Sequence, residues 1–295
     1  MIFIHTNKQG KLMIHMGIFN RYLKEGKGVS KDEPEEYRFF LFFKLFFRKF
    51  SKLIILNLIY FLTLLPLIIG IYLSVNVNPD IVKTPQLIFS RPLFVYTGDI
   101  IGLVLMILSV FVSAPATAGF VFVIRNFQRQ EHAWIFSDFK DQFVKNYKQS
   151  VFVGIMDLII YNLAYVAFVF YAFGGYGTAF QQIKSVAPFL AAVITVITLV
   201  YTWMHHYMYL MMVTFKLKFK DLLKNSMIFS LAKSPTNIFL TIIIAIIVFI
   251  NIIIPILSII ISFSLVGYII IFTVYPSVDK LMIQPYSNKD SEYNE

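Results

Sequence analysis

The chain has no cysteine and few charged residues, and each shortage excludes a class of protein. None of its 295 residues is Cys, and only 14% are charged. Without thiols the protein holds no disulfide and no thiolate metal site. Soluble domains carry about 25% charged residues, whereas here 58% are hydrophobic and the mean hydropathy is +0.72. So much apolar surface excludes a soluble enzyme, a disordered protein and a secreted disulfide scaffold, and it predicts a membrane protein.

Recognisable catalytic motifs are also missing. The sequence contains no HExxH zinc motif, no GxxxxGK[ST] phosphate loop and no nucleophile elbow, and it has five histidines in all. These are the patterns that hold a catalytic metal, a nucleotide phosphate or an activated serine. We therefore expect neither enzymatic activity nor a cofactor.

Long apolar runs predict an all-α polytopic membrane bundle. Bounded by charges, the runs are Leu53–Leu73, Phe94–Ile124, Val151–Phe173, Phe189–Phe215 and Ile238–Val274. Each reaches the ~20 residues that a membrane-spanning helix needs. The last run would form one helix of about 55 Å, and Pro255 divides it. We predict six spans, at about 53–73, 94–124, 151–173, 189–215, 238–253 and 256–275. The alternative is five spans, with 238–274 as one kinked helix.

Basic residues predict the orientation. Residues 1–52 hold 11 Lys and Arg, and segments 125–149 and 216–237 hold five each, against two in 74–93 and one in 174–188. Lys and Arg accumulate on the cytoplasmic side of short loops, so we expect a multi-pass protein of the cell membrane with a cytoplasmic N-terminus. The net charge of +10 then reflects topology, and we expect no nucleic-acid partner.

This orientation predicts three parts of the chain: a polar cytoplasmic tail at 1–37, a transmembrane domain at 38–276 and a polar tail at 277–295. Residues 1–37 show no apolar core followed by a cleavage site, so we expect no signal peptide before the first span.

The segment Tyr37–Phe50 mixes phenylalanines with cations. On a helix, the cations Arg38, Lys44, Arg48, Lys49 and Lys52 fall within an arc of about 140°, and most phenylalanines, among them Phe42, Phe43, Phe46 and Phe47, fall opposite. The pattern predicts a helix lying on the inner leaflet, with its cations against anionic lipid headgroups. A simple basic flank of the first span is the alternative. Segments 137–149 and 215–223 predict similar amphipathic helices on the cytoplasmic side.

Polar residues inside the spans are costly and need a reason. Asp157 lies in the third span, His205 and His206 in the fourth, Asn57 in the first and Thr117 in the second. All five fall at comparable depth in the inner leaflet. One hypothesis is a polar site with Asp157 as its charge and one histidine as a proton-exchanging partner, because adjacent helical residues point about 100° apart. The other is that these groups join helices by hydrogen bonds.

Two stretches resemble a known family. Residues 16–50, MGIFNRYLKEGKGVSKDEPEEYRFFLFFKLFFRKF, and 113–139, SAPATAGFVFVIRNFQRQEHAWIFSDF, are similar to the YesL-like bacterial membrane proteins, whose domain is catalogued as domain of unknown function 624. The Pro-Ala-Thr-Ala-Gly step at 115–119 followed by Arg125 is the most recognisable feature. The family brings no catalytic residues. Residues 1–15 lie outside the likeness, which leaves both Met1 and Met16 open as the start of translation.

The family's members are often encoded beside carbohydrate-uptake systems. The resemblance therefore implies an accessory or scaffold protein linked to carbohydrate uptake or utilisation. The alternative is a small-solute transporter with the inner-leaflet polar site, in which Pro115 and Pro255 break helices. The sequence leaves the substrate, the partner and the oligomeric state open.

Overall fold

The computed structural model describes residues 3–6, 12–15, 37–76, 100–173 and 183–283. The chain forms two compact units, residues 1–41 and 42–295. In the first, β1 (Phe3–Thr6) and β2 (Leu12–His15) pair antiparallel, with Phe3 opposite His15. The sequence interpretation treated this region as a polar tail and did not predict the hairpin. The boundary between the units falls within helix α1 (Arg38–Arg48).

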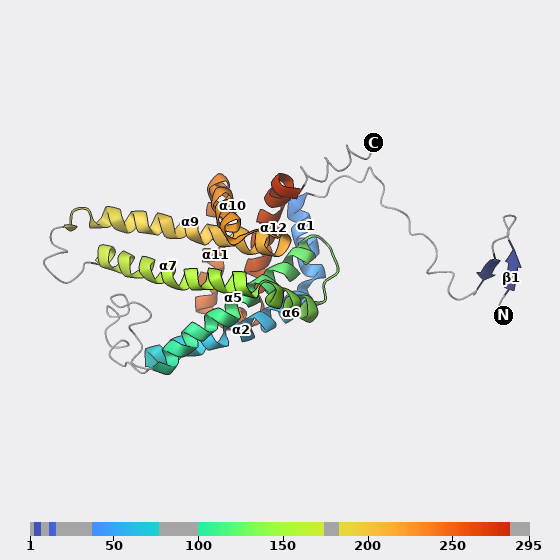
Figure 1. The fold of residues 1–295 in the computed structure, drawn as a ribbon, viewed down its shortest axis with the longest axis horizontal. Coiled ribbons are helices and arrows are strands. Elements are labelled where there is room, and N and C mark those ends of the chain that lie inside the picture. Colours follow the sequence, from blue (N-terminus) through green and yellow to red (C-terminus); the bar gives the residue numbers. More distant parts are fainter. Residues whose placement is uncertain (1–2, 7–11, 16–36, 77–99, 174–182, 284–295) are drawn as a thin grey trace. The chain divides into compact units, whose positions relative to one another are not determined.

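The second unit is helical, and the described residues of the whole chain contain nine α-helices. After α1 they are α2 (Phe50–Asn76), α5 (Ile100–Gln128), α6 (Ile135–Lys145), α7 (Tyr147–Phe173), α9 (Ala187–Thr214), α10 (Phe219–Ala232), α11 (Ser234–Ile253) and α12 (Phe263–Val278). Two π-helical segments, η2 (Ser258–Ser262) and η3 (Asp279–Ile283), flank α12. Figure 1 shows the arrangement.

Six of these segments are long and apolar enough to cross a membrane, which confirms the predicted number of candidate spans. They lie at 50–70, 104–128, 147–172, 187–214, 234–253 and 258–283. Residues 94–99, where we predicted the second span to begin, lie outside the described residues. The expectation that Pro115 breaks a helix is wrong, because α5 runs through it without interruption. A proline is tolerated in such a helix where neighbouring helices support the backbone.

Helix α5 lies at the centre of the second unit. Its most apolar stretch is 61% buried, against 11% for α11, and it contacts α2, α6, α7, α9 and α12. Small residues explain the close packing: a Cβ on Gly119 would lie 2.5 Å from the Phe139 carbonyl of α6, and one on Gly154 of α7 would lie 2.8 Å from Ala114. Small residues at helix contacts let backbones approach closely.

The last apolar run breaks where the proline predicted. Helix α11 ends at Ile253, and the chain turns through Ile254 and Pro255 before helical structure resumes. The Leu257 and Ser258 N–H groups donate to the carbonyls of Ile254 and Pro255. The two-helix interpretation of 238–274 is therefore confirmed over the single kinked helix.

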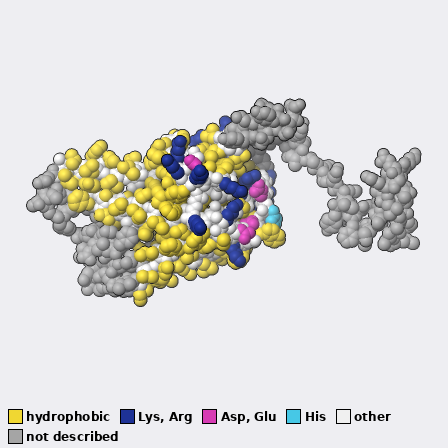
Figure 2. Space-filling view, in the orientation of Figure 1, with side chains coloured by type: hydrophobic (Ala, Val, Ile, Leu, Met, Phe, Trp, Pro, Cys, Tyr) yellow, Lys and Arg dark blue, Asp and Glu magenta, His cyan; other side chains and the backbone are white. Residues whose placement is uncertain are grey.

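Charge and apolar surface separate along the second unit. In Figure 2 the Lys and Arg side chains gather at the end that carries α6 and α10, whereas hydrophobic side chains cover the face over α7 and α9. These two long helices pack side by side (Figure 1). The distribution is that of a membrane protein with one basic end.

Candidate functional site

A cavity of about 950 Å³ lies among the helices. Its walls come from α2, α5, α7, α9, α11, η2 and α12. Sites for small molecules commonly have volumes of about 300–1,000 Å³ and mostly apolar walls with a few polar groups. The lining has this character and includes one carboxylate, Asp157, two histidines, His205 and His206, and no Lys or Arg among the described residues. The cavity is therefore an apolar chamber with one acidic group.

Asp157 is held from one side by helix α9. The Tyr201 hydroxyl donates to Asp157 Oδ1 at 2.7 Å, and His205 Nε2 lies 2.8 Å from the same oxygen. The histidine contact has ion-pair distance without the alignment of an N–H hydrogen bond. The Asp157 side chain stays 25% exposed and that of His205 18%. Since both line the cavity, the carboxylate remains accessible from it.

Other cavity groups keep hydrogen-bonding capacity. Within the part of the chain that the structure describes, His206 Nδ1 and Asn162 Oδ1 are buried without a hydrogen-bond partner, and both residues line the cavity. Buried polar atoms in native proteins are usually paired. Both atoms are themselves buried, so they lie beside the cavity without being exposed to it.

Four of the five polar residues singled out from the sequence line this one cavity, namely Thr117, Asp157, His205 and His206. We expected only one of the two histidines to face a common cavity, and this is wrong. His205 and His206, which are adjacent on α9, both line it. Asp157 does find a donor and a histidine. Tyr201, its closest partner, was missed, although Tyr201, His205 and Tyr209 recur every four residues along one face of a helix.

Asn57 and Thr117, which lie at a similar predicted depth, do not bond to Asp157, and both instead join helices. Thr117 shares a hydrogen bond of 2.9 Å with the Tyr60 hydroxyl and donates to the Ser113 carbonyl. Asn57 is fully buried and does not line the cavity. Its role is to join helices, because all its hydrogen bonds go to the segment that follows α11.

Two asparagines hold the break between α11 and α12. Asn57 Nδ2 donates to the carbonyls of Ser258 (3.0 Å) and Ile259 (2.6 Å), and Asn57 Oδ1 accepts the Ser264 N–H at 3.0 Å. Asn251 Oδ1 accepts the hydroxyls of Ser258 and Ser262 at 2.8 and 2.7 Å. The π-helical turn that lines the cavity is thus supported from both sides. Such irregular turns in helices often mark functional sites.

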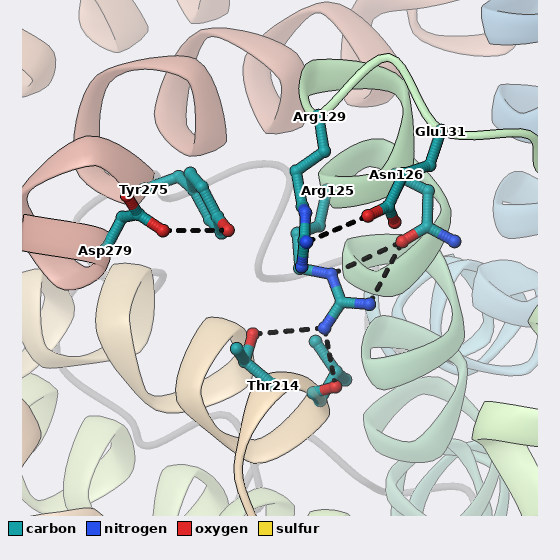
Figure 3. A network of polar contacts seen from close by, with 8 residues as sticks. Arg125, Asn126, Arg129, Glu131, Thr214, Tyr275 and Asp279 are labelled. Atoms are coloured by element: carbon teal, nitrogen blue, oxygen red, sulfur yellow. Dashed lines mark hydrogen bonds and ion pairs between the residues drawn. The ribbon is translucent and has the colours of Figure 1, made fainter. Parts of the chain in front are cut away.

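Arg125 lies at the basic end of the second unit and joins two of its helices (Figure 3). Its guanidinium is buried and donates to the Val213 carbonyl (2.9 Å) and the Thr214 hydroxyl (3.2 Å) at the end of α9. Two further bonds reach Asn126 Oδ1. A helix leaves its last carbonyls without intrahelical partners, so Arg125 caps α9 and joins it to α5. A second pair, Arg129 with Glu131 at 2.9 Å, lies beside it.

The segment predicted as an interfacial helix is helical as α1, and its phenylalanines have different surroundings. Phe42 and Phe46 contact the Tyr268 ring of α12 in tilted geometry, whereas Phe43 and Phe47 are 41% and 68% exposed. Part of the aromatic face therefore packs on protein. That the rest lies on anionic lipid stays a prediction.

The predicted cations of α1 and its flank are distributed along the helix. Arg38 opens the helix and Lys44 lies near its middle. Arg48 donates to Gln130 Oε1 at 3.0 Å, and Lys49 lies over the Phe127 ring. Burial, with Lys52 and Arg48 nearby, lowers the pKa of Lys49. A dense basic cluster favours an anionic counter-surface such as lipid headgroups.

Metal chemistry is not supported by any cluster in the described ranges. No three His, Asp or Glu side chains there lie close enough to hold a metal ion. What the cavity offers is a carboxylate, two histidines, hydroxyls and amides in an apolar chamber, which is a set suited to binding a solute.

Comparison with known proteins agrees with the resemblance seen in the sequence. Neither the curated proteins nor the solved structures contain a significant match to this chain. A family model described as "Protein of unknown function, DUF624" matches residues 91–168, a segment that includes α5, α6 and the part of α7 bearing Asp157. The chain is thus a multi-span membrane protein that carries the DUF624 family signature over residues 91–168.

Proposed function

We propose that the protein binds a small amphipathic cation in its intramembrane cavity, as one step in moving that solute across the membrane. The observation that carries the proposal is the partly exposed carboxylate of Asp157 in a chamber whose described lining residues include no Lys or Arg. A carboxylate in an apolar chamber attracts positive charge more strongly than one in water, because the local dielectric is lower.

The apolar walls favour a solute that is largely hydrophobic. Aromatic rings from three helices, at Tyr60, Phe120 and Tyr161, border the chamber. Aromatic faces attract cations in addition to burying apolar groups.

A role in transport is supported by the interrupted last segment. Transport sites are commonly built beside discontinuous helices near polar residues inside the membrane. Here Ser258 and Ser262 of the π-helical turn line the same chamber as Asp157. A segment that is not a regular helix can change conformation more readily than one that is.

Binding can be tested with tetraphenylphosphonium, a hydrophobic cation, and tetraphenylborate, an anion of closely similar shape. Equilibrium dialysis of the purified protein in detergent should show saturable binding of the cation and none of the anion. Asp157→Asn should weaken cation binding at least tenfold, about 1.4 kcal/mol. Asp141→Asn is the matched control, since Asp141 is an exposed acid on α6 and does not line the cavity.

The proposal fails if the cation does not bind saturably, or if Asp157→Asn binds it as tightly as the Asp141→Asn control. Binding of the anion with equal affinity would also contradict it, because the chamber would then select shape and apolarity alone. Association with a carbohydrate-uptake system, which the family resemblance implies, stays a separate prediction that co-purification from native membranes would test.

A further inference from the structure

We propose that α11 and α12 form a re-entrant hairpin, which enters the membrane from the cytoplasmic side, turns inside the bilayer at Ile254–Leu257 and returns to the same side. The inference is independent of the solute that the cavity binds. It rests on the depth at which each part of the hairpin contacts the helices around it.

Helices α2 and α5 supply a scale of depth. Helix α2 begins at Phe50, directly after the basic helix α1, and Lys49 lies over Phe127 near the cytoplasmic end of α5. Ten residues further into α5, Thr117 bonds to Tyr60 of α2. The two helices therefore keep one register, and at 1.5 Å per residue Asn57 lies about 10 Å deep and Tyr60 about 15 Å deep.

The last helical segment begins at the depth of Asn57 and runs from there toward the cytoplasm. The Ser258 and Ile259 carbonyls bond to Asn57, the Ser264 hydroxyl donates to the Leu53 carbonyl, and Tyr268 contacts Phe42 of α1. From Ser258 through Ser264 to Tyr268, the contacts thus shift from Asn57 to Leu53 and then to α1, toward the cytoplasmic end. A segment that starts about 10–15 Å deep cannot cross the ~30 Å of hydrocarbon in this direction.

Helix α11 reaches the same layer from beside the cytoplasmic half of α9. Near its start, Asn237 bonds to Tyr207, and Thr241 accepts the indole N–H of Trp203. At its far end Asn251 bonds to Ser258 and Ser262, which lie at the depth of Asn57. A 20-residue helix is about 30 Å long, so α11 must be strongly inclined. In Figure 1 α7 and α9 extend well beyond α11 and α12.

A turn inside the bilayer requires its backbone polar groups to be bonded within the protein. The turn meets this condition through its own hydrogen bonds, through Asn57 and through Asn251. The hairpin also borders the cavity, with residues of α11, η2 and α12 in its wall.

The absence of cysteine from the chain makes a direct test available. Single variants Ile254→Cys and Ile256→Cys would be treated in intact cells with a membrane-impermeant maleimide. Ser185→Cys, in the exposed loop before α9, is the outside control, and Lys216→Cys, after α9, is the cytoplasmic control. Labelling after denaturation in detergent, together with normal abundance, establishes that each variant is present and inserted.

We expect Ser185→Cys to be labelled in intact cells, Lys216→Cys only after the membranes are opened, and the two turn variants in neither condition. Labelling of either turn variant in intact cells would mean that the hairpin crosses the bilayer, and the inference would be wrong. Labelling only in opened membranes would place the turn in the cytoplasm and also overturn it. A reporter fused near the C-terminus would not separate these cases, since both topologies return the chain to the cytoplasm.

Discussion

Replacing Asn57 by leucine should destabilise the protein by removing the support of the hairpin. The amide makes two donor bonds to backbone carbonyls and accepts one backbone N–H, all to residues 258–264, and it is fully buried. Hydrogen bonds between membrane helices contribute about 0.6 kcal/mol each on average, so three amount to about 2 kcal/mol. A buried N–H left unbonded adds about 1–3 kcal/mol. We expect a total loss of about 3–5 kcal/mol in the free energy of unfolding.

Unfolding in mixed micelles by titration with dodecyl sulfate, followed by circular dichroism, would measure this loss. Asn162→Leu is the matched control, because Asn162 Nδ2 donates only within its own helix, to the Leu158 carbonyl. That variant should lose less than about 0.5 kcal/mol. Equal destabilisation by the two leucine variants would refute the assignment of Asn57 as the anchor of the hairpin.

Two further outcomes are expected. Gly119→Val should cost about 1–3 kcal/mol in the same micelle titration, since its Cβ would press on the Phe139 carbonyl, and unchanged stability would show that α6 can move away. Arg125→Lys should lower the detergent melting temperature, because an ammonium cannot reproduce the forked bonds to Thr214 and Asn126; an unaltered melting temperature would argue against the cap on α9.

Much of the fold could be predicted from local composition. Apolar runs bounded by charge gave the six long helices, Pro255 marked the break in the last run, and the excess of Lys and Arg identified the basic end. These features depend on residues near one another in the chain. The depth of the hairpin depends instead on contacts between residues far apart in the chain. Hydropathy reports that a segment is apolar and says nothing about how far it enters the bilayer.

The candidate site was predicted in part for the same reason. Depth along a helix can be estimated from sequence, and it placed Thr117, Asp157 and the histidines in one layer. The rotation of each helix about its axis cannot be estimated from depth alone, so Asn57 was a candidate partner of Asp157, whereas its side chain faces the hairpin. Tyr201 was overlooked because tyrosines near a span end are typical of the interfacial aromatic belt. Its spacing from His205 was the available signal.

The central claim is that a cationic solute binds inside the cavity beside Asp157. The most direct measurement is a crystal structure with tetraphenylarsonium, whose arsenic can be located by anomalous scattering independently of the surrounding detergent. The account predicts one principal peak inside the chamber lined by Asp157, Tyr161 and His205, absent from crystals of Asp157→Asn. A peak only on the lipid-facing surface of α11, or a cavity peak that persists unchanged in the variant, would contradict it.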